Sequence, residues 1–149
     1  MGPAGSSAGQ GLEDREERLM EDQTELQDRL LSELEEAGEE NLPTLANTIF
    51  AEEMTVDQQR AGIRSALAGL INADLVRVAF EDATGRELRE ISKELSERVI
   101  EQLDDHLVLR SDGTWTGGPR PWPEVVTTEK GKARARVILE TRGCQWWRQ

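Results

Sequence analysis

Apolar residues recur at intervals of three and four over most of this chain, and this periodicity favours a mainly helical fold. The pattern is clearest in segments that run from Leu12 to Ala37, from Val56 to Ala73 and from Gly85 to Asp104. Each segment places its apolar residues along one face and most of its charged residues on the other. We therefore expect three amphipathic helices that bury their apolar faces in one core.

Short polar patterns mark where the helices begin. Thr55 with Gln58, and Thr84 with Glu87, have the spacing of a capping box, in which each side chain binds a backbone N–H of the other residue. The same kind of signal predicts two further helices, from Asn41 to Phe50 and from Thr128 to Arg142, the second ended by Gly143.

Extended segments separate these helices. The β-branched and aromatic stretch Leu75 to Phe80 predicts a strand, and Glu124 to Thr127 is extended as well. An Asp-Gly pair between His106–Arg110 and Thr114–Thr116 predicts a small β-ribbon. Three prolines and two glycines make Gly117 to Pro123 an exposed loop. The fold class predicted is mainly α with a small β-wing.

The sequence divides into a domain and two short flanks. Residues 1–11 consist of small and polar residues, which predicts a disordered segment, and residues 12–143 form a single domain. The tail, residues 144–149, contains Trp146 and Trp147. These aromatic side chains either fold back on the core, which we favour, or anchor a partner.

Charge is distributed unevenly along the chain. Residues 1–53 contain 15 acidic and 3 basic side chains, whereas residues 54–149 contain 15 of each. The acidic face of the helix predicted for residues 12–37 is therefore a candidate surface for a basic partner. Leu12, Leu19 and Leu26 lie seven apart on this helix, a spacing that would suit a homodimer seam, but we favour packing of the helix on its own domain.

The inventory of reactive residues argues against several functions. Cys144 and His106 are single residues of their type, so a disulfide, a cysteine and histidine metal site or a histidine-based catalytic pair has no basis. We expect no enzyme activity, no metal and no cofactor. No apolar run is long enough for a membrane span, and the N-terminal residues do not resemble a signal peptide, so we expect a cytoplasmic protein.

Two stretches carry a resemblance to a known architecture. Gln59 to Val76, a leucine-rich helix running into a strand, resembles the third helix and following strand of the MarR-like and PadR-like winged-helix regulators. Val125 to Ala135, with its Thr-x-x-Gly pattern, is similar to the strand-to-helix exit of that fold. Asp74 stands where the pattern has glycine. The wing is either Leu75 to Phe80 with its partner or the ribbon around Asp112.

The resemblance implies a winged-helix-like α+β domain, with an extra helix and an acidic N-terminal helix, that regulates transcription by binding double-stranded DNA. The helix from Val56 would then enter the major groove, and the wing would touch the backbone. The DNA-binding residues implied are Gln58, Gln59, Arg60, Arg64, Arg110 and Arg120.

A second interpretation uses the same fold as a protein-interaction module. Its acidic N-terminal helix would bind a basic partner or mimic nucleic acid, which suits the net charge of −12. Glutamine and arginine on the Val56 helix would then be no more than the ordinary polar surface of a helix.

Overall fold

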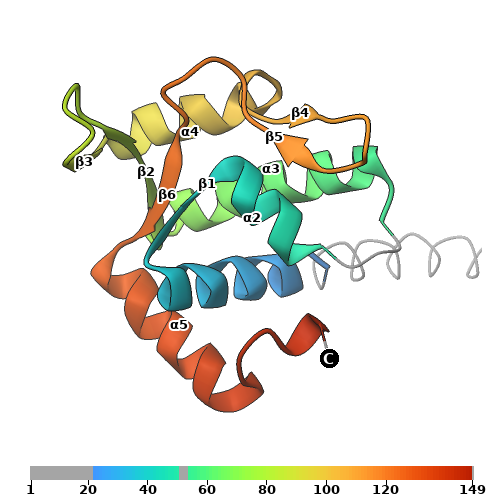
Figure 1. The fold of residues 1–149 in the computed structure, drawn as a ribbon. Coiled ribbons are helices and arrows are strands. Elements are labelled where there is room, and N and C mark those ends of the chain that lie inside the picture. The colour runs from blue at the N-terminus through green and yellow to red at the C-terminus, as the bar shows by residue number, and fades with distance from the viewer. Residues whose placement is uncertain (1–21, 51–53, 149) are drawn as a thin grey trace, which may run out of the picture.

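The computed structural model describes residues 22–50 and 54–148, which form a mainly helical α+β fold with a small antiparallel sheet (Figure 1). Residues 22–37 are helical and confirm the described part of the first predicted helix; the rest of that prediction, like the segment 1–11, lies outside the described residues. The elements that follow are β1 (Glu39–Asn41), α2 (Leu42–Ile49), α3 (Val56–Asn72), β2 (Val76–Glu81), β3 (Leu88–Glu90), α4 (Lys93–Glu101), η1 (Leu103–Asp105), β4 (Val108–Leu109), β5 (Trp115–Thr116), β6 (Glu124–Thr127), α5 (Glu129–Arg142) and η2 (Trp146–Arg148).

Four strands make the main sheet, in the order β1-β6-β2-β3, and all of its pairs are antiparallel. The register places Val125 of β6 between Glu40 of β1 and Val78 of β2. Val125 and Val78 are buried, so one face of the sheet covers the core. The other face carries the residues that alternate with them.

The core lies between this sheet and the helices. Its largest fully buried side chains come from the N-terminal helix, α2, α3 and the segment that follows β3. Because leucine and isoleucine dominate it, apolar burial is the main stabilising term. Members that represent each part of the core are Leu30, Leu34, Leu45, Ile49, Ile63, Leu67, Leu70, Ile100 and Leu103.

Residues 82–123 are inserted between two paired strands, β2 and β6. The insertion contains β3, α4, η1 and the β4-β5 ribbon, which Figure 1 shows above α3. Leu103, Leu107 and Trp115 of this segment are buried in the common core. The insertion is therefore an integral part of the fold.

The Thr-x-x-Gly pattern attaches α5 to the end of α3. The Thr128 hydroxyl donates to the Asp74 carbonyl oxygen at 2.6 Å and accepts from the Gly131 backbone N–H at 3.0 Å. A Cβ atom on Gly131 would lie 2.0 Å from the Leu75 carbonyl oxygen, so only glycine permits this close approach. Asp74 has φ of 63°, a left-handed conformation that is uncommon for residues other than glycine.

One predicted helix is wrong in its first half. Residues 85–104 were expected to form a continuous helix capped by Thr84 and Glu87, but the chain makes β3 first and begins α4 only at Lys93. The Asp82 carboxylate accepts from the Thr84 backbone and hydroxyl at 3.0 Å and 2.6 Å, which folds a turn instead of a cap. Ser92 supplies the helix cap.

Most other elements agree with the sequence predictions. The Thr55 and Gln58 capping box, the β4-β5 ribbon, the strand β6 and the helix that ends before Gly143 are present. The short strand β1 was not predicted. The loop between β5 and β6 forms no helix or strand, but Pro123 within it is buried rather than exposed.

The tail folds back onto the N-terminal helix and α2, as Figure 1 shows at the end marked C. The indole N–H of Trp146 donates to the Glu25 carboxylate at 2.9 Å, and that of Trp147 donates to the Thr48 carbonyl oxygen at 3.1 Å. Arg142 binds both oxygens of Glu25, at 2.7 Å and 3.0 Å. The tail is thus a clasp across the N-terminal helix, which agrees with the interpretation favoured from the sequence.

Candidate functional site

Four residues of α3 are predicted to contact DNA. In the structure, all four make contacts within the chain. Gln58 completes the capping box, its side chain accepting from the Thr55 backbone N–H at 2.9 Å. Gln59 donates to the Met54 carbonyl oxygen at 3.0 Å and accepts from the Trp115 indole N–H at 2.9 Å. Both glutamines therefore stabilise the start of α3 and its junction with the ribbon.

The two arginines of α3 converge on one carboxylate of the inserted segment. The same Asp104 oxygen lies 3.3 Å from Nε of Arg60 and 3.0 Å from Nη2 of Arg64. The guanidinium of Arg60 also stacks over the Trp115 ring, 5.2 Å from its centre. Both arginines are therefore engaged in contacts within the chain, although each side chain keeps about a third of its surface exposed.

Trp115 is the centre of this arrangement. Asn47 of α2 binds its backbone on both sides: the Asn47 amide nitrogen donates to the Trp115 carbonyl oxygen at 2.9 Å, and the Trp115 N–H donates back at 2.7 Å. The side chain of Asn47 thereby pairs with β5 much as a neighbouring strand would. Ribbon and α2 are fixed together, with α3 against the indole.

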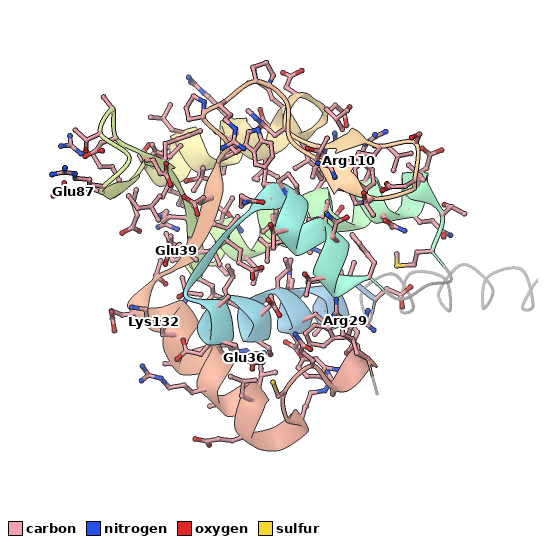
Figure 2. The ribbon with its side chains drawn as sticks, in the orientation of Figure 1. Arg29, Glu36, Glu39, Glu87, Arg110 and Lys132 are labelled. Atoms are coloured by element: carbon pink, nitrogen blue, oxygen red, sulfur yellow. The ribbon has the colours of Figure 1, made fainter. Side chains whose placement is uncertain are left out.

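The remaining two predicted DNA-binding residues lie on different segments of the insertion. Arg110 follows β4 on the ribbon, where Figure 2 labels it, and its guanidinium donates to the Thr116 hydroxyl at 3.3 Å. Arg120 lies in the loop after β5, with its guanidinium 4.4 Å from the centre of the Trp122 ring. The structure thus brings Gln59 and Arg60 to Trp115 and joins Arg60 and Arg64 through Asp104, whereas Arg120 contacts a different indole, that of Trp122.

Cations of α5 meet the acidic N-terminal helix of their own chain. Arg136 pairs with Glu35 at 3.2 Å, and Arg142 contacts Asp28 at 3.5 Å in addition to Glu25. Although burial opposes ionisation, hydrogen bonds from Arg142 and Trp146 lower the pKa of Glu25. Part of the acidic surface expected to receive a basic partner is therefore covered by α5 and the tail.

An acidic surface that the sequence did not reveal lies on the outer face of the sheet. Glu39 of β1, Glu124 of β6 and Glu81 of β2 occupy the positions that alternate with the buried face. No ion pair joins any of the three to a cation within residues 22–50 and 54–148. We call these three glutamates the acidic sheet face; Figure 2 labels Glu39 on β1.

Acidic side chains outnumber basic ones on this face and in the pocket beside it, where Arg120 lies. Burial, followed by the nearby carboxylates of Glu81 and Glu39, raises the pKa of Glu124. Arg77, the basic residue of β2, is directed to the Asp74 carboxylate at 2.7 Å. A positive group placed among the three carboxylates would therefore relieve their mutual repulsion.

A surface pocket of about 370 Å³ opens at this face. Glu124 and Asn41 lie on the strands beneath it, Glu81 and Asp82 come from the end of β2, and the loop before β6 closes the remaining side. The pocket thus combines carboxylates with one aromatic wall. The lining residues from the loop are Arg120, Pro121 and Trp122.

A second pocket, of about 460 Å³, lies between the N-terminal helix and α3. Its apolar lining includes Leu26, Met54 and Ala61. Two of its charged residues are already engaged: Arg29 donates to the Ile49 carbonyl oxygen at 3.0 Å, and Glu25 belongs to the clasp. This pocket could enclose an apolar group, but it has few polar groups that are free to bind a ligand.

The described residues contain no cluster of three or more histidine, cysteine or acidic side chains that could hold a metal ion. Cys144 donates from its thiol to the Glu36 carboxylate. Among the helices that the structure describes, none has the length and apolar character needed to cross a membrane.

Comparison with known protein families, with curated proteins and with solved structures found no match to this chain.

Proposed function

We propose that this protein is a non-catalytic, winged-helix-like interaction module whose acidic sheet face binds a basic segment of another polypeptide. The order of the elements supports the winged-helix likeness: a helix, β1, two helices, β2, β6 and α5 follow one another, and β6 pairs between β1 and β2. In this interpretation the insertion of residues 82–123 replaces a short wing.

The observation that carries the proposal is the acidic sheet face itself. Glu39, Glu81 and Glu124 lie on three neighbouring strands, and none is ion-paired in the described part of the chain. Burial, together with the nearby carboxylates of Glu81 and Glu39, raises the pKa of Glu124 and so disfavours its negative charge. A lysine-rich or arginine-rich segment supplies the missing charge and gains both affinity and speed of association from it.

The alternative function, regulation of transcription through DNA, has weaker support from the geometry. Binding of a duplex depends on cations that are free to neutralise phosphates. Arg60 and Arg64 instead share Asp104, and the residues that α3 exposes include Asp57, Ala61 and Ser65. These contacts favour a protein partner over DNA.

The test is a titration of fluorescently labelled basic and neutral peptides, and of a labelled DNA duplex, with the full chain at several salt concentrations. We expect the basic peptide to bind, with an affinity that falls as salt rises. The double variant Glu81→Gln with Glu124→Gln should weaken binding about tenfold, because each lost carboxylate removes about 0.5 to 1 kcal/mol of charge attraction.

A matched control changes the same number of charges elsewhere. Glu94→Gln with Glu101→Gln on α4 alters two exposed glutamates outside the acidic sheet face and should change the affinity less than about twofold. Equal losses in both double variants would mean that net charge, not this face, binds the peptide. Absence of peptide binding at low salt, or duplex binding that Arg60→Ala and Arg64→Ala abolish, would contradict the proposal.

A further inference from the structure

Beneath the loop before β6, the pocket on the acidic sheet face already holds a cation at its aromatic wall. The guanidinium of Arg120 lies 4.4 Å from the centre of the Trp122 ring, within the range of a cation–π contact. In the part of the chain that the structure describes, Arg120 is not ion-paired with Glu81, Asp82 or Glu124, although all line the same pocket. Arg120 thus occupies the aromatic wall of a pocket whose other lining residues include three carboxylates.

The indole that forms this wall is held in place. Its ring N–H donates to the Gly118 carbonyl oxygen at 2.8 Å. The ring also lies against Gly117, where a Cβ atom would come within 2.3 Å of it, so a larger residue at 117 would push it out. The hydrogen bond to Gly118 and the close approach of Gly117 fix the ring, and the contact with Arg120 shows that a guanidinium can stack on it.

We propose that the pocket binds one arginine side chain of the basic partner, and that Arg120 is a built-in competitor for the same aromatic wall. The inference rests on the proposed function, because it names the group that the acidic sheet face receives. The incoming guanidinium stacks on Trp122 and directs its N–H groups to Glu81 and Glu124, while Arg120 turns out to solvent.

The chemistry of the pocket favours arginine over lysine. A guanidinium is planar and weakly hydrated, so it stacks on an indole and binds carboxylates through several N–H groups at once. An ammonium group is a compact, strongly hydrated charge, for which the carboxylates alone would provide the attraction. The pocket volume of about 370 Å³ is large enough to admit one arginine side chain.

The competition makes an unusual prediction about Arg120. Arg120→Gln removes the internal cation and should tighten the binding of an arginine-containing basic peptide about three- to tenfold. Trp122→Leu should weaken it by a similar factor. Arg110→Gln is the matched control, because it removes one exposed positive charge from the ribbon, away from the pocket, and should change the affinity less than twofold.

The experiment measures dissociation constants by fluorescence anisotropy for two labelled peptides of equal charge, one built on arginine and one on lysine. Tighter binding of the arginine peptide, enhanced by Arg120→Gln and reduced by Trp122→Leu, supports the pocket. Circular dichroism melts of both variants check that they remain folded, and the resonance of the Trp122 ring N–H should shift when peptide binds the wild type.

The outcomes separate this inference from the proposed function. If Glu81→Gln with Glu124→Gln weakens peptide binding but Arg120→Gln has the same effect as Arg110→Gln, the acidic sheet face binds the partner and the arginine pocket is wrong. Equal affinities for the two peptides would overturn the inference in the same way. If no basic peptide binds, both proposals fail together.

Discussion

At the scale of single residues, Gly131 shows how local preference and packing can oppose each other. Alanine is favoured over glycine within a helix by about 1 kcal/mol. At this position, however, an added Cβ atom would meet the Leu75 carbonyl oxygen at 2.0 Å. Backbone atoms cannot turn aside as a flexible side chain does, so α5 would have to move away from the segment that joins α3 to β2.

We therefore expect Gly131→Ala to destabilise the protein by about 1 to 3 kcal/mol, the usual cost of overpacking. Chemical denaturation measures the change. Gly69→Ala in α3 is the control, because its Cβ atom would meet the movable amide end of Gln27 at 2.4 Å. Equal stability changes in the two variants would contradict the role assigned to the close approach at Leu75.

Glu40 is a second residue whose environment sets a measurable property. It lies on the core side of β1, next to the buried Glu33, which accepts from the Gln145 amide at 3.3 Å. Burial and the adjacent Glu33 carboxyl raise the pKa of Glu40 to about 8. The other ionisable groups near this pair are Glu36 on the same helix and Cys144 on the tail.

A raised pKa means that the folded chain binds a proton that the unfolded chain has released. The stability that Glu40 contributes is therefore present below about pH 4.5 and is lost as the pH rises towards 8. We expect Glu40→Gln to flatten this decline and to stabilise the protein by at least about 1 kcal/mol at pH 9. Urea denaturation across this pH range tests it, and the exposed Glu39→Gln should retain the wild-type decline.

At the scale of elements, the joint between α2 and the ribbon depends on Asn47. Its amide group binds both the N–H and the carbonyl oxygen of the buried Trp115, at 2.7 Å and 2.9 Å. Asn47→Ala leaves both backbone groups without these partners and should cost about 1 to 3 kcal/mol. Faster hydrogen exchange of the Trp115 amide would report the loss directly. Asn72→Ala, at the exposed end of α3, should leave this amide protected.

The helices and strands also include both the most and the least successful sequence predictions. The capping box at Thr55 and the Thr128 cap could be predicted because their signals lie within a few residues. The strand β3 could not, since Thr84 and Glu87 fit a helix cap and only the Asp82 turn excludes it. Strand β1 is three residues long and becomes a strand through pairing with the distant β6.

The candidate site was hidden for the same reason. Glu39, Glu81 and Glu124 are scattered along the sequence, and only the register of the sheet brings them to one face. The arginines of α3 were recognised as a group, but their ion-pair partner Asp104 was not. It belongs to the insertion, and no local sequence pattern shows that this part of the insertion lies against α3. Periodicity predicts which residues face the core, but not which surfaces meet.

At the scale of the whole molecule, Glu25 joins the beginning and the end of the described chain. It accepts hydrogen bonds from Arg142 and Trp146, and Arg29 lies 3.3 Å away on the same helix. We expect Glu25→Gln to lower the stability by about 1 to 2 kcal/mol at low salt and by less at high salt. Thermal melts at two salt concentrations measure this. Asp22→Asn, on the exposed side of the same helix, is the charge-matched control.

The clasp also has a consequence for how the chain folds. Trp146 and Glu25 are separated by 121 residues in sequence, so their contact closes a loop that is almost the length of the described chain. A contact between distant residues forms only after the entropic cost of closing the long loop between them has been met, so such contacts tend to form late in folding. The clasp should accordingly have little influence on the folding rate and should mainly lower the unfolding rate. The clasp would then lengthen the lifetime of the folded state, because a folded molecule opens less often.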